Sequence, residues 1–436
     1  MKLVKLEYVD PLKLYSVLRD ESMPFILESL TKHEHKARFT FLSANPEFVV
    51  EIREETKVDG KKVLKERNPF LALKQLFKGE SGKTKFSGGF VGYTAYDAVH
   101  SVIGGSIDEA SVYGYYSRVF VYDHVAGNFY FLSLSGSKEE EKYAERIIAK
   151  AKRARIEEEK GGSSVIGCDA EKEEFMEMVE NAKEYIFAGD AFQIVLSREY
   201  CIETDYSAFQ IYRKLREINP SPYMFLLEFD KKAVVGASPE TMASVENNVV
   251  KINPIAGTAP RGKSDEEDAE IAAKLLADEK ERAEHVMLVD LARNDVRRVS
   301  KPGSVRVTRF FDVVRYSHVQ HIESEVEGLL ADDMTMFDAM DAAFPAGTLT
   351  GAPKIRAMEI IDELEKSRRR VYGGGVGYFS VSGCADMAIA IRMVEMDKVC
   401  RIRAGAGIVA DSKPEKEFYE TEKKMAAVMK AFGVIG

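Results

Sequence analysis

The spacing of apolar residues along the chain predicts helices and strands that mix without a regular repeat. Apolar side chains recur at helical spacing from Phe175 to Ile186, and Gly189 is expected to end that helix. Residues 191–200 then alternate as a strand does, with Gln193 on one of its faces. Further strands are predicted at residues 233–237, 249–253, 374–381, 387–394 and 399–404, and a further helix at residues 139–155. Because the βα repeat of a barrel is missing, the pattern favours an α+β fold built on antiparallel sheets.

A charged stretch that turns glycine- and serine-rich interrupts this pattern at residues 157–164. Such a composition is typical of a linker or an exposed loop. The sequence therefore predicts two parts, an N-terminal part at residues 1–160 and a core at residues 165–436. We expect the two parts to form one interwoven globule.

A segment of small residues near the C-terminus precedes a helix with charges on one face. Residues 405–407 (Gly-Ala-Gly) are expected to form a turn whose uncovered backbone N–H groups bind a carboxylate. Ser412 and Glu415 match a capping box, and Pro414 suits the first turn of the helix. In that helix three charged side chains share one face, at spacings of three and four: Glu417, Glu420 and Lys424.

A second predicted helix, at residues 279–295, also carries a pair of carboxylates. Asp278 is a suitable N-cap, and Glu281 and Glu284 follow at a spacing of three. Either pair by itself is more often a solvated helix face than a site. Two such helices could enclose a hard divalent cation, and ligation by oxygen alone suits Mg²⁺ better than zinc.

Charge and cysteine content narrow the class of protein. The 436 residues carry a formal net charge of -9, which argues against general binding of nucleic acid. The four cysteines, at positions 168, 201, 384 and 400, have neither CxxC spacing nor the density of a disulfide scaffold, as in a reducing compartment. No run of about 18 apolar residues occurs that would span a membrane. We expect a cytosolic protein without a membrane partner.

Four turn-rich segments lie between the strands and carry groups suited to chemistry. They are residues 236–240, which end in Glu240, residues 254–262, residues 317–322, which include His321, and residues 344–354. Singly, each is more often a turn than a site, and a lone histidine is usually structural.

Together, the ordered motifs resemble those of the chorismate-utilising enzyme family, and within it the members that form anthranilate. The motifs are GASPE at 236–240, PIAGT at 254–258, EHVMLVDLARND at 284–295, VQHIES at 319–324, GTLTGAPK at 347–354, YGGGVGYF at 372–379 and RAGAGIV at 403–409. The resemblance covers about residues 170–436. It implies an α+β fold in which two antiparallel sheets, flanked by helices, sandwich the active site.

The resemblance also implies roles for individual residues. Mg²⁺, the expected cofactor, would be held by Glu284 and Glu420, with Glu281 and Glu417 beside it. The substrate chorismate would be bound by Gly257, Thr258, Thr348, Tyr372, Arg392, Gly405, Ala406, Gly407 and Lys424. Glu240 matches the general acid for departure of the C4 hydroxyl group, and His321 matches the base for pyruvate elimination. Gln193 and Thr258 complete the catalytic set.

Two positions separate members of the family. Relatives that add water carry a lysine base where this chain has Gln193, and a neutral amide cannot deprotonate water. Relatives that make 4-amino-4-deoxychorismate commonly carry a nucleophilic lysine where this chain has Ala256. An ammonia-using lyase that forms anthranilate and pyruvate, in the first step of tryptophan biosynthesis, is therefore the main prediction. The alternatives are the synthase component for aminodeoxychorismate and a non-catalytic amino-acid-binding relative.

The N-terminal part resembles the family segment that binds tryptophan as a feedback inhibitor. The matching contacts are Glu28, Ser29, Pro222, Tyr223 and Met224, and either Lys36 or Arg38 would supply the expected basic residue. None of the cysteines lies in the Gly-x-Cys-x-Gly setting of a glutaminase nucleophile. The resemblance therefore implies a hetero-oligomer in which a separate glutamine amidotransferase subunit delivers ammonia.

Overall fold

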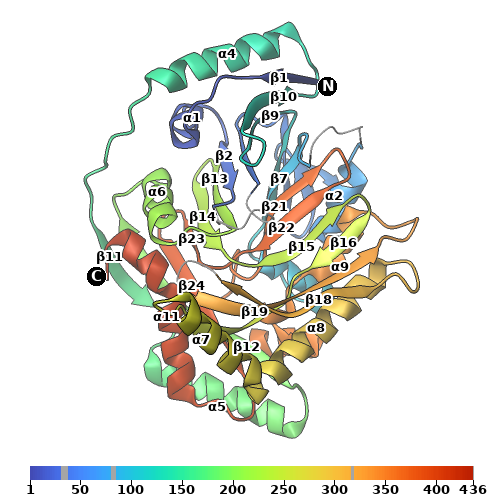
Figure 1. Ribbon diagram of the computed structural model, residues 1–436, viewed down its shortest axis with the longest axis vertical. Coiled ribbons are helices and arrows are strands. Elements are labelled where there is room, and N and C mark those ends of the chain that lie inside the picture. The colour runs from blue at the N-terminus through green and yellow to red at the C-terminus, as the bar shows by residue number, and fades with distance from the viewer. Residues whose placement is uncertain (31–37, 80–84, 316–318, 436) are drawn as a thin grey trace.

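Two large antiparallel sheets packed face to face form the centre of the molecule, and helices cover their outer faces (Figure 1). The computed structural model describes residues 1–30, 38–79, 85–315 and 319–435. The predicted α+β fold with two antiparallel sheets is confirmed.

One sheet, sheet A, carries the small-residue segment. Its strands, in spatial order, are β1 (Lys2–Lys5), β10 (Asn128–Ser133), β9 (Arg118–Asp123), β3 (Phe39–Ser43), β2 (Phe25–Glu28), β13 (Tyr223–Phe229), β14 (Lys232–Ser238), β23 (Met393–Met396), β24 (Cys400–Ile408), β12 (Gln193–Thr204) and β11 (Ser163–Cys168). The short β20 (Gly351–Ala352) also pairs with β12.

The other sheet, sheet B, carries the predicted catalytic histidine. Its strands, in spatial order, are β17 (Ile255–Pro260), β19 (Val319–Leu329), β16 (Val249–Ile252), β15 (Thr241–Glu246), β22 (Ala385–Ile389), β21 (Gly375–Ser380), β7 (Gly89–Thr94), β8 (Ser111–Tyr116), β4 (Phe48–Ile52), β5 (Thr56–Val58) and β6 (Lys61–Leu64). The long β18 (Arg306–Arg315) pairs with β19.

Both sheets contain strands from before residue 160 and from after residue 165. In sheet A, β2 pairs with β13, and in sheet B, β7 pairs with β21. Neither part of the chain has a complete sheet of its own, so each needs the other to cover its apolar faces. The predicted linker is shorter than expected, because Ser163 and Ser164 already pair with β12 as part of β11.

The helices lie on the outside of the sheets. They are α1 (Pro11–Leu18), α2 (Pro69–Leu76), α3 (His100–Ile103), α4 (Lys138–Arg153), α5 (Lys172–Ala188), α6 (Ala208–Ile218), α7 (Asp265–Ala277), α8 (Glu279–Val299), α9 (Met336–Ala343), α10 (Lys354–Leu364) and α11 (Pro414–Phe432), with 3-10 turns η1 (Tyr96–Val99) and η2 (Gly347–Leu349). The helix α5 ends at Gly189 in the left-handed conformation, as predicted. Asp278 caps α8 through the N–H groups of Lys280 and Glu281, also as predicted.

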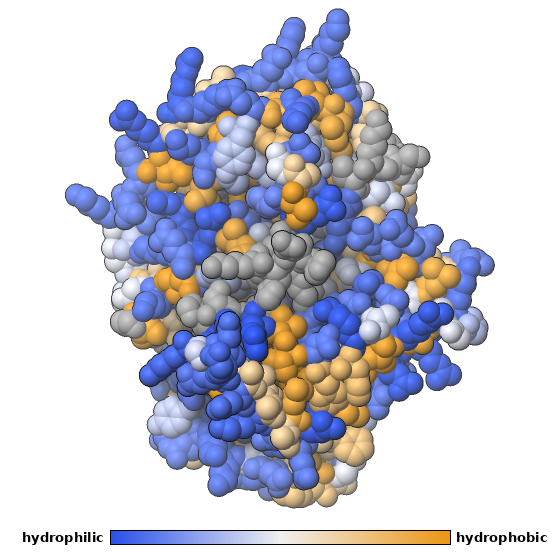
Figure 2. Space-filling model, viewed as in Figure 1, coloured by the Kyte–Doolittle hydropathy of each residue, from blue (hydrophilic) through white to orange (hydrophobic). Residues whose placement is uncertain are grey.

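Apolar side chains gather in three main cores. Aromatic residues from both sheets, among them Phe41, Phe225 and Tyr378, fill the space between the sheets. The helices α1, α4, α6 and α11 pack on the outer face of sheet A, and α2, α8 and α9 pack on that of sheet B. Polar side chains dominate the face seen in Figure 2, where apolar side chains form scattered small groups. In the described ranges, no helix is both long and apolar enough to cross a membrane.

Two local predictions near the C-terminus are wrong. Gly405 and Gly407 lie in strand β24, opposite Ser197 and Val195 of β12, and not in a turn. Glycine is needed there for close packing, since a methyl group on Gly405 would lie 2.7 Å from the carbonyl oxygen of Leu196. The N-cap of α11 is Lys413, which makes no side-chain capping bond, so Ser412 and Glu415 do not form the predicted capping box.

Candidate active site

Glu240 connects β14 to β15, where it is half-buried. The hydroxyl group of Thr348, in η2, donates a hydrogen bond of 2.8 Å to Oε1 of Glu240. Burial raises the pKa of Glu240 to about 7, and the nearby charge of Glu323 raises it further, while Thr348 and the charge of Lys424 oppose the rise. A carboxyl group with this pKa holds a proton near neutral pH and can act as a general acid.

His321 lies on β19 beside the backbone of β17. Its Nδ1 is 2.8 Å from the carbonyl oxygen of Gly257 and 3.1 Å from Oγ1 of Thr258. Because a carbonyl oxygen accepts only, we assign the ring proton to Nδ1, which makes Nε2 the basic nitrogen. His321 and Glu323 lie two residues apart and share one face of β19. The charge of Glu323 acts on Glu240, so the two carboxyl groups lie near each other.

The side chain of Gln193, at the start of β12, is 3% exposed and points at α8. Its Nε2 donates a hydrogen bond of 3.1 Å to Oε1 of Glu284. Its Oε1 is buried and has no hydrogen-bond partner among the described residues. A methyl group on Gly407 would lie 2.7 Å from Nε2 of Gln193, so glycine at 407 leaves the room that this amide occupies.

Around Gly405 the structure gathers three more of the predicted substrate-binding residues. A methyl group on Gly405 would lie 3.2 Å from the Tyr372 hydroxyl oxygen, and Nζ of Lys424 donates to the Gly405 carbonyl oxygen at 2.9 Å. Arg392 donates to the carbonyl oxygen of Lys424 at 2.5 Å. Burial raises the pKa of Tyr372 to about 12, so its hydroxyl group stays protonated and can donate to an anion. The Tyr372 hydroxyl group and the Lys424 ammonium group thus both lie at Gly405, and Arg392 bonds to the backbone of Lys424, so donors suited to a carboxylate gather in this region.

The backbone of β24 also directs hydrogen-bond donors away from β12 at Gly405 and Gly407. The N–H groups of Ser197 and Val195, opposite Gly405 and Gly407, bond to Glu365 and Thr350 and not to β24. These are therefore the non-hydrogen-bonded pairs of the ladder, in which the N–H groups of Gly405 and Gly407 point away from β12. The predicted anion-binding N–H groups are thus present on a strand.

The four predicted metal-binding carboxylates lie on two facing helices. Burial raises the pKa of Glu281, on α8, and the charges of Glu284, Asp278 and Glu420 add to this. Burial likewise raises the pKa of Glu417, on α11, which the charge of Glu420 supports. A divalent cation would relieve this mutual repulsion, and oxygen donors suit Mg²⁺, so the residues fit the ion.

These carboxylates do not form a finished metal site. Within the described ranges, no group of three or more His, Cys, Asp or Glu side chains is close enough to hold a metal ion. Glu284 accepts from Gln193, and Glu420 pairs with Lys424 at 2.6 Å. The Glu281 carboxylate lies close to the backbone segment that bonds to His321. A methyl group on Gly257 would lie 3.2 Å from Oε2 of Glu281.

A separate cavity of about 260 Å³ between the sheets is lined by all five residues of the predicted tryptophan site: Glu28, Ser29, Pro222, Tyr223 and Met224. Arg38 also lines it, whereas Lys36 lies outside the described residues. The remaining walls are partly aliphatic and include the aromatic and charged residues Phe39, Phe41, Tyr378, Lys85, Glu246 and Asp386. Charges of both signs beside aromatic rings suit an aromatic amino acid, which is a zwitterion.

Glu28 and Tyr223 meet this cavity in different ways. The Glu28 carboxylate points to the opposite face of sheet A, where Arg216 and Tyr212 of α6 donate to it. Its hydrogen-bond partners therefore lie outside the cavity. The Tyr223 hydroxyl group lies 2.8 Å from that of Thr241 and 2.9 Å from Oδ1 of Asp386. Thr241 directly follows Glu240 in the chain, so a residue that lines the cavity bonds to the neighbour of Glu240.

The comparisons with known proteins agree with this arrangement. The family model described as chorismate binding enzyme matches residues 22–430. The chain belongs to the chorismate-binding enzyme family. It is 64% identical over 435 residues to anthranilate synthase component 1 of Thermococcus kodakarensis, covering 100% of both chains. It is 54% identical over 430 residues to anthranilate synthase component 1 of Archaeoglobus fulgidus, covering 99% of this chain and 100% of that one.

A solved structure supports the same family fold. Anthranilate synthase component I from Streptococcus pneumoniae superposes with a TM-score of 0.80 at 34% identity, covering 90% of this chain and 92% of that chain. The resemblance to the chorismate-utilising family that the motifs indicated is confirmed.

The sequence did not identify several polar groups that serve the sites of this chorismate-binding enzyme. Lys85, Glu246 and Asp386 line the cavity between the sheets, and Arg369 lies behind the Thr348 turn. A single sequence carries no signal for the first three, because each lies in a different segment of the chain. The run Arg368-Arg369-Arg370 gives no signal for the fourth either, since arginine is mostly exposed and only its ion pair with Glu365 explains why Arg369 is buried.

Proposed function

We propose that this enzyme forms anthranilate and pyruvate from chorismate and ammonia, as the synthase component of an anthranilate synthase. The observation that carries the proposal is the combination of Glu240, an acid near neutral pH, with the neutral amide of Gln193. An acid is needed to release the C4 hydroxyl group as water. A neutral amide leaves ammonia, which needs no base when it arrives unprotonated, as the nucleophile.

In the first step, the ammonia nitrogen forms a bond to C2 of the ring. Both double bonds of the ring diene shift toward C4, the C4–O bond breaks, and Glu240 gives its proton to the departing oxygen, which leaves as water. The ammonium group formed at C2 releases one proton to solvent and becomes an amine. The Thr348 hydroxyl group then stabilises the Glu240 carboxylate through its hydrogen bond. Tyr372, Arg392 and the N–H groups of Gly405 and Gly407 would hold the enolpyruvyl carboxylate in place.

In the second step, Nε2 of His321 removes the proton from C2. The bond between the ring and the enolpyruvyl oxygen breaks, the ring becomes aromatic, and pyruvate leaves as its enolate, which takes up a proton at its methylene carbon. The carbonyl oxygen of Gly257 stabilises the imidazolium that forms, because it accepts from Nδ1. Glu284 and Glu420, with Glu281 and Glu417, would hold Mg²⁺, which when bound supplies a Lewis acid for the ring carboxylate.

The test is the reaction itself, followed by anthranilate fluorescence. The purified chain, given chorismate, Mg²⁺ and ammonium, should produce anthranilate emission, and the absence of tryptophan residues keeps the background low. Chromatography of the products separates the alternatives. Accumulation of aminodeoxychorismate, or binding of an amino acid without turnover, would contradict the proposal.

The source of nitrogen gives a further prediction. Cys168, Cys201, Cys384 and Cys400 are free thiols, as expected for the cytosol, where we place the enzyme. Burial raises the pKa of Cys168, Cys201 and Cys400, which disfavours the reactive thiolate form at neutral pH. The chain by itself should therefore use ammonium but not glutamine, and glutamine should support turnover once a glutamine amidotransferase subunit is added. Anthranilate made from glutamine by the single chain would refute the need for a partner.

Regulation by tryptophan is proposed for the cavity between the sheets. Arg38 or Lys85 would pair with the inhibitor carboxylate, Glu246 or Asp386 with its ammonium group, and the aromatic rings would hold the indole. The Ser29→Phe variant should lose inhibition with little change in uninhibited turnover, because the new ring fills the cavity. Ser29→Ala is the matched control, since it keeps the cavity open and should remain inhibited. Equal inhibition of the Phe variant and the parent would place the inhibitor elsewhere.

A further inference from the structure

Arg369 is a buried cation that lies behind the active site. Its side chain is 2% exposed, and it follows α10 in the turn that leads to Tyr372. Its Nη1 donates to the carbonyl oxygen of Leu349 at 2.5 Å, and its Nη2 donates to that of Val195 at 2.6 Å. These two bonds cross-link segments that lie 20 and 174 residues away in the sequence.

The two acceptors belong to segments that carry active-site groups. Leu349 directly follows Thr348, whose hydroxyl group bonds to Glu240. Val195 lies two residues after Gln193 and therefore on the same face of β12. The backbone carbonyl oxygen of Arg369 accepts the N–H of Tyr372 at 3.1 Å, and the Arg369 guanidinium lies 6.0 Å from the Tyr372 ring centroid. The side chain of Arg369 thus joins two parts of the site by hydrogen bonds and lies near a third.

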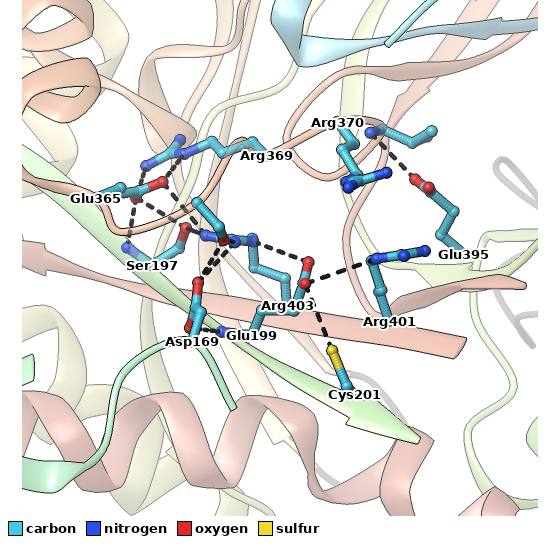
Figure 3. Close-up of polar contacts among 12 residues, drawn as sticks. Asp169, Ser197, Glu199, Cys201, Glu365, Arg369, Arg370, Glu395, Arg401 and Arg403 are labelled. Atoms are coloured by element: carbon cyan, nitrogen blue, oxygen red, sulfur yellow. Dashed lines mark hydrogen bonds and ion pairs between the residues drawn. The ribbon is translucent and has the colours of Figure 1, made fainter. Parts of the chain in front are cut away.

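A second layer of charges holds Arg369 in one orientation (Figure 3). Glu365 accepts from Nε of Arg369 at 3.0 Å and from Nη2 at 2.6 Å. The same carboxylate accepts from the backbone N–H and the hydroxyl group of Ser197, and Arg403 lies within 3.4 Å of it. A planar guanidinium can serve all these acceptors at once, whereas the point charge of lysine cannot.

We propose that Arg369 is a positioning residue: through Leu349 and Val195 it fixes the Thr348 hydroxyl group against Glu240 and holds the Gln193 strand in register with that pair. Arg369 itself touches neither substrate nor the reacting atoms. The inference goes beyond the proposed function, but its kinetic test rests on the activity proposed above.

The test uses Arg369→Lys in the full chain, with turnover measured against pH at a constant concentration of unprotonated ammonia. Loss of the cross-link should loosen Thr348 and lower kcat/KM for chorismate on the order of 10²-fold. Because the Thr348 bond lowers the pKa of Glu240, the alkaline limb of kcat should move to higher pH, by about one unit. The other charged groups that face Glu240, Lys424 on α11 and Glu323 on β19, are unchanged in this variant.

Thr348→Val should move the same limb in the same direction, and adding Arg369→Lys to it should move the limb no further. The matched control is Arg198→Lys, which changes another buried arginine, one that lies on β12 and bonds to Ala170 and Glu422. This control should lower the melting temperature and leave the limb in place. If Arg369→Lys does not fold, Glu365→Gln can replace it, because it removes the negative charge that holds Arg369 in place. This variant should shift the alkaline limb of kcat less, but in the same direction.

An unchanged limb in a folded Arg369 or Glu365 variant, or additive shifts in the double variant, would overturn the inference. A parent chain without any anthranilate formation would instead overturn the proposed function. The two failures are therefore distinguishable.

Discussion

Replacing Glu240 by glutamine should block the reaction before the aminated intermediate forms. The amide keeps the size of the side chain and can still accept from Thr348, but it cannot release a proton to the C4 oxygen. General acid catalysis contributes about 10²- to 10⁴-fold, so kcat should fall by that factor. In the parent, the active form of Glu240 is protonated, so kcat should fall as pH rises through about 7. That limb should be missing from the variant.

His321→Met offers the comparison that divides the chemistry. Without the imidazole, the C2 proton stays in place, and the aminated intermediate should accumulate while anthranilate formation falls. Chromatography of the products checks both variants. Equal loss of both steps in the His321 variant, or intermediate accumulated by Glu240→Gln, would contradict the division of roles.

Removing one carboxylate from either facing helix should have the second large effect. Glu284→Gln and Glu420→Gln keep the shape of each side chain but remove a hard anionic donor, so Mg²⁺ should bind more weakly by calorimetry. Turnover at limiting Mg²⁺ should fall with it, by about 10-fold or more if each lost contact is worth at least 1.4 kcal/mol. The fold should be retained, because neither carboxylate lies in an apolar core.

A matched control for the metal variants lies on the same helix. Glu279→Gln removes an exposed carboxylate in the first turn of α8 and should leave Mg²⁺ binding and turnover near the parent values. Parent-like Mg²⁺ affinity in Glu284→Gln and Glu420→Gln would exclude these residues as ligands. A similar loss in Glu279→Gln would point to a general effect of surface charge.

The cavity between the sheets shows which features the sequence predicts and which depend on distant residues. The segments that form the cavity were predicted from their resemblance, and the structure brings them together. The direction of the Glu28 side chain was not predictable. It depends on Arg216 and Tyr212, which lie 188 and 184 residues away and attract the carboxylate to the opposite face of sheet A.

Short-range patterns in the sequence determined the helices that carry the carboxylate pairs, the end of α5 at Gly189 and the cap at Asp278, because helical periodicity and capping depend on neighbours within a few residues. Only the tertiary structure decided that Gly405 and Gly407 lie in a strand, since the space that excludes a side chain there belongs to β12 and Tyr372. It also decided the acidity of Glu240, through burial and a hydroxyl group 108 residues away. Burial and long-range hydrogen bonds arise when distant segments meet, so no local pattern contains them.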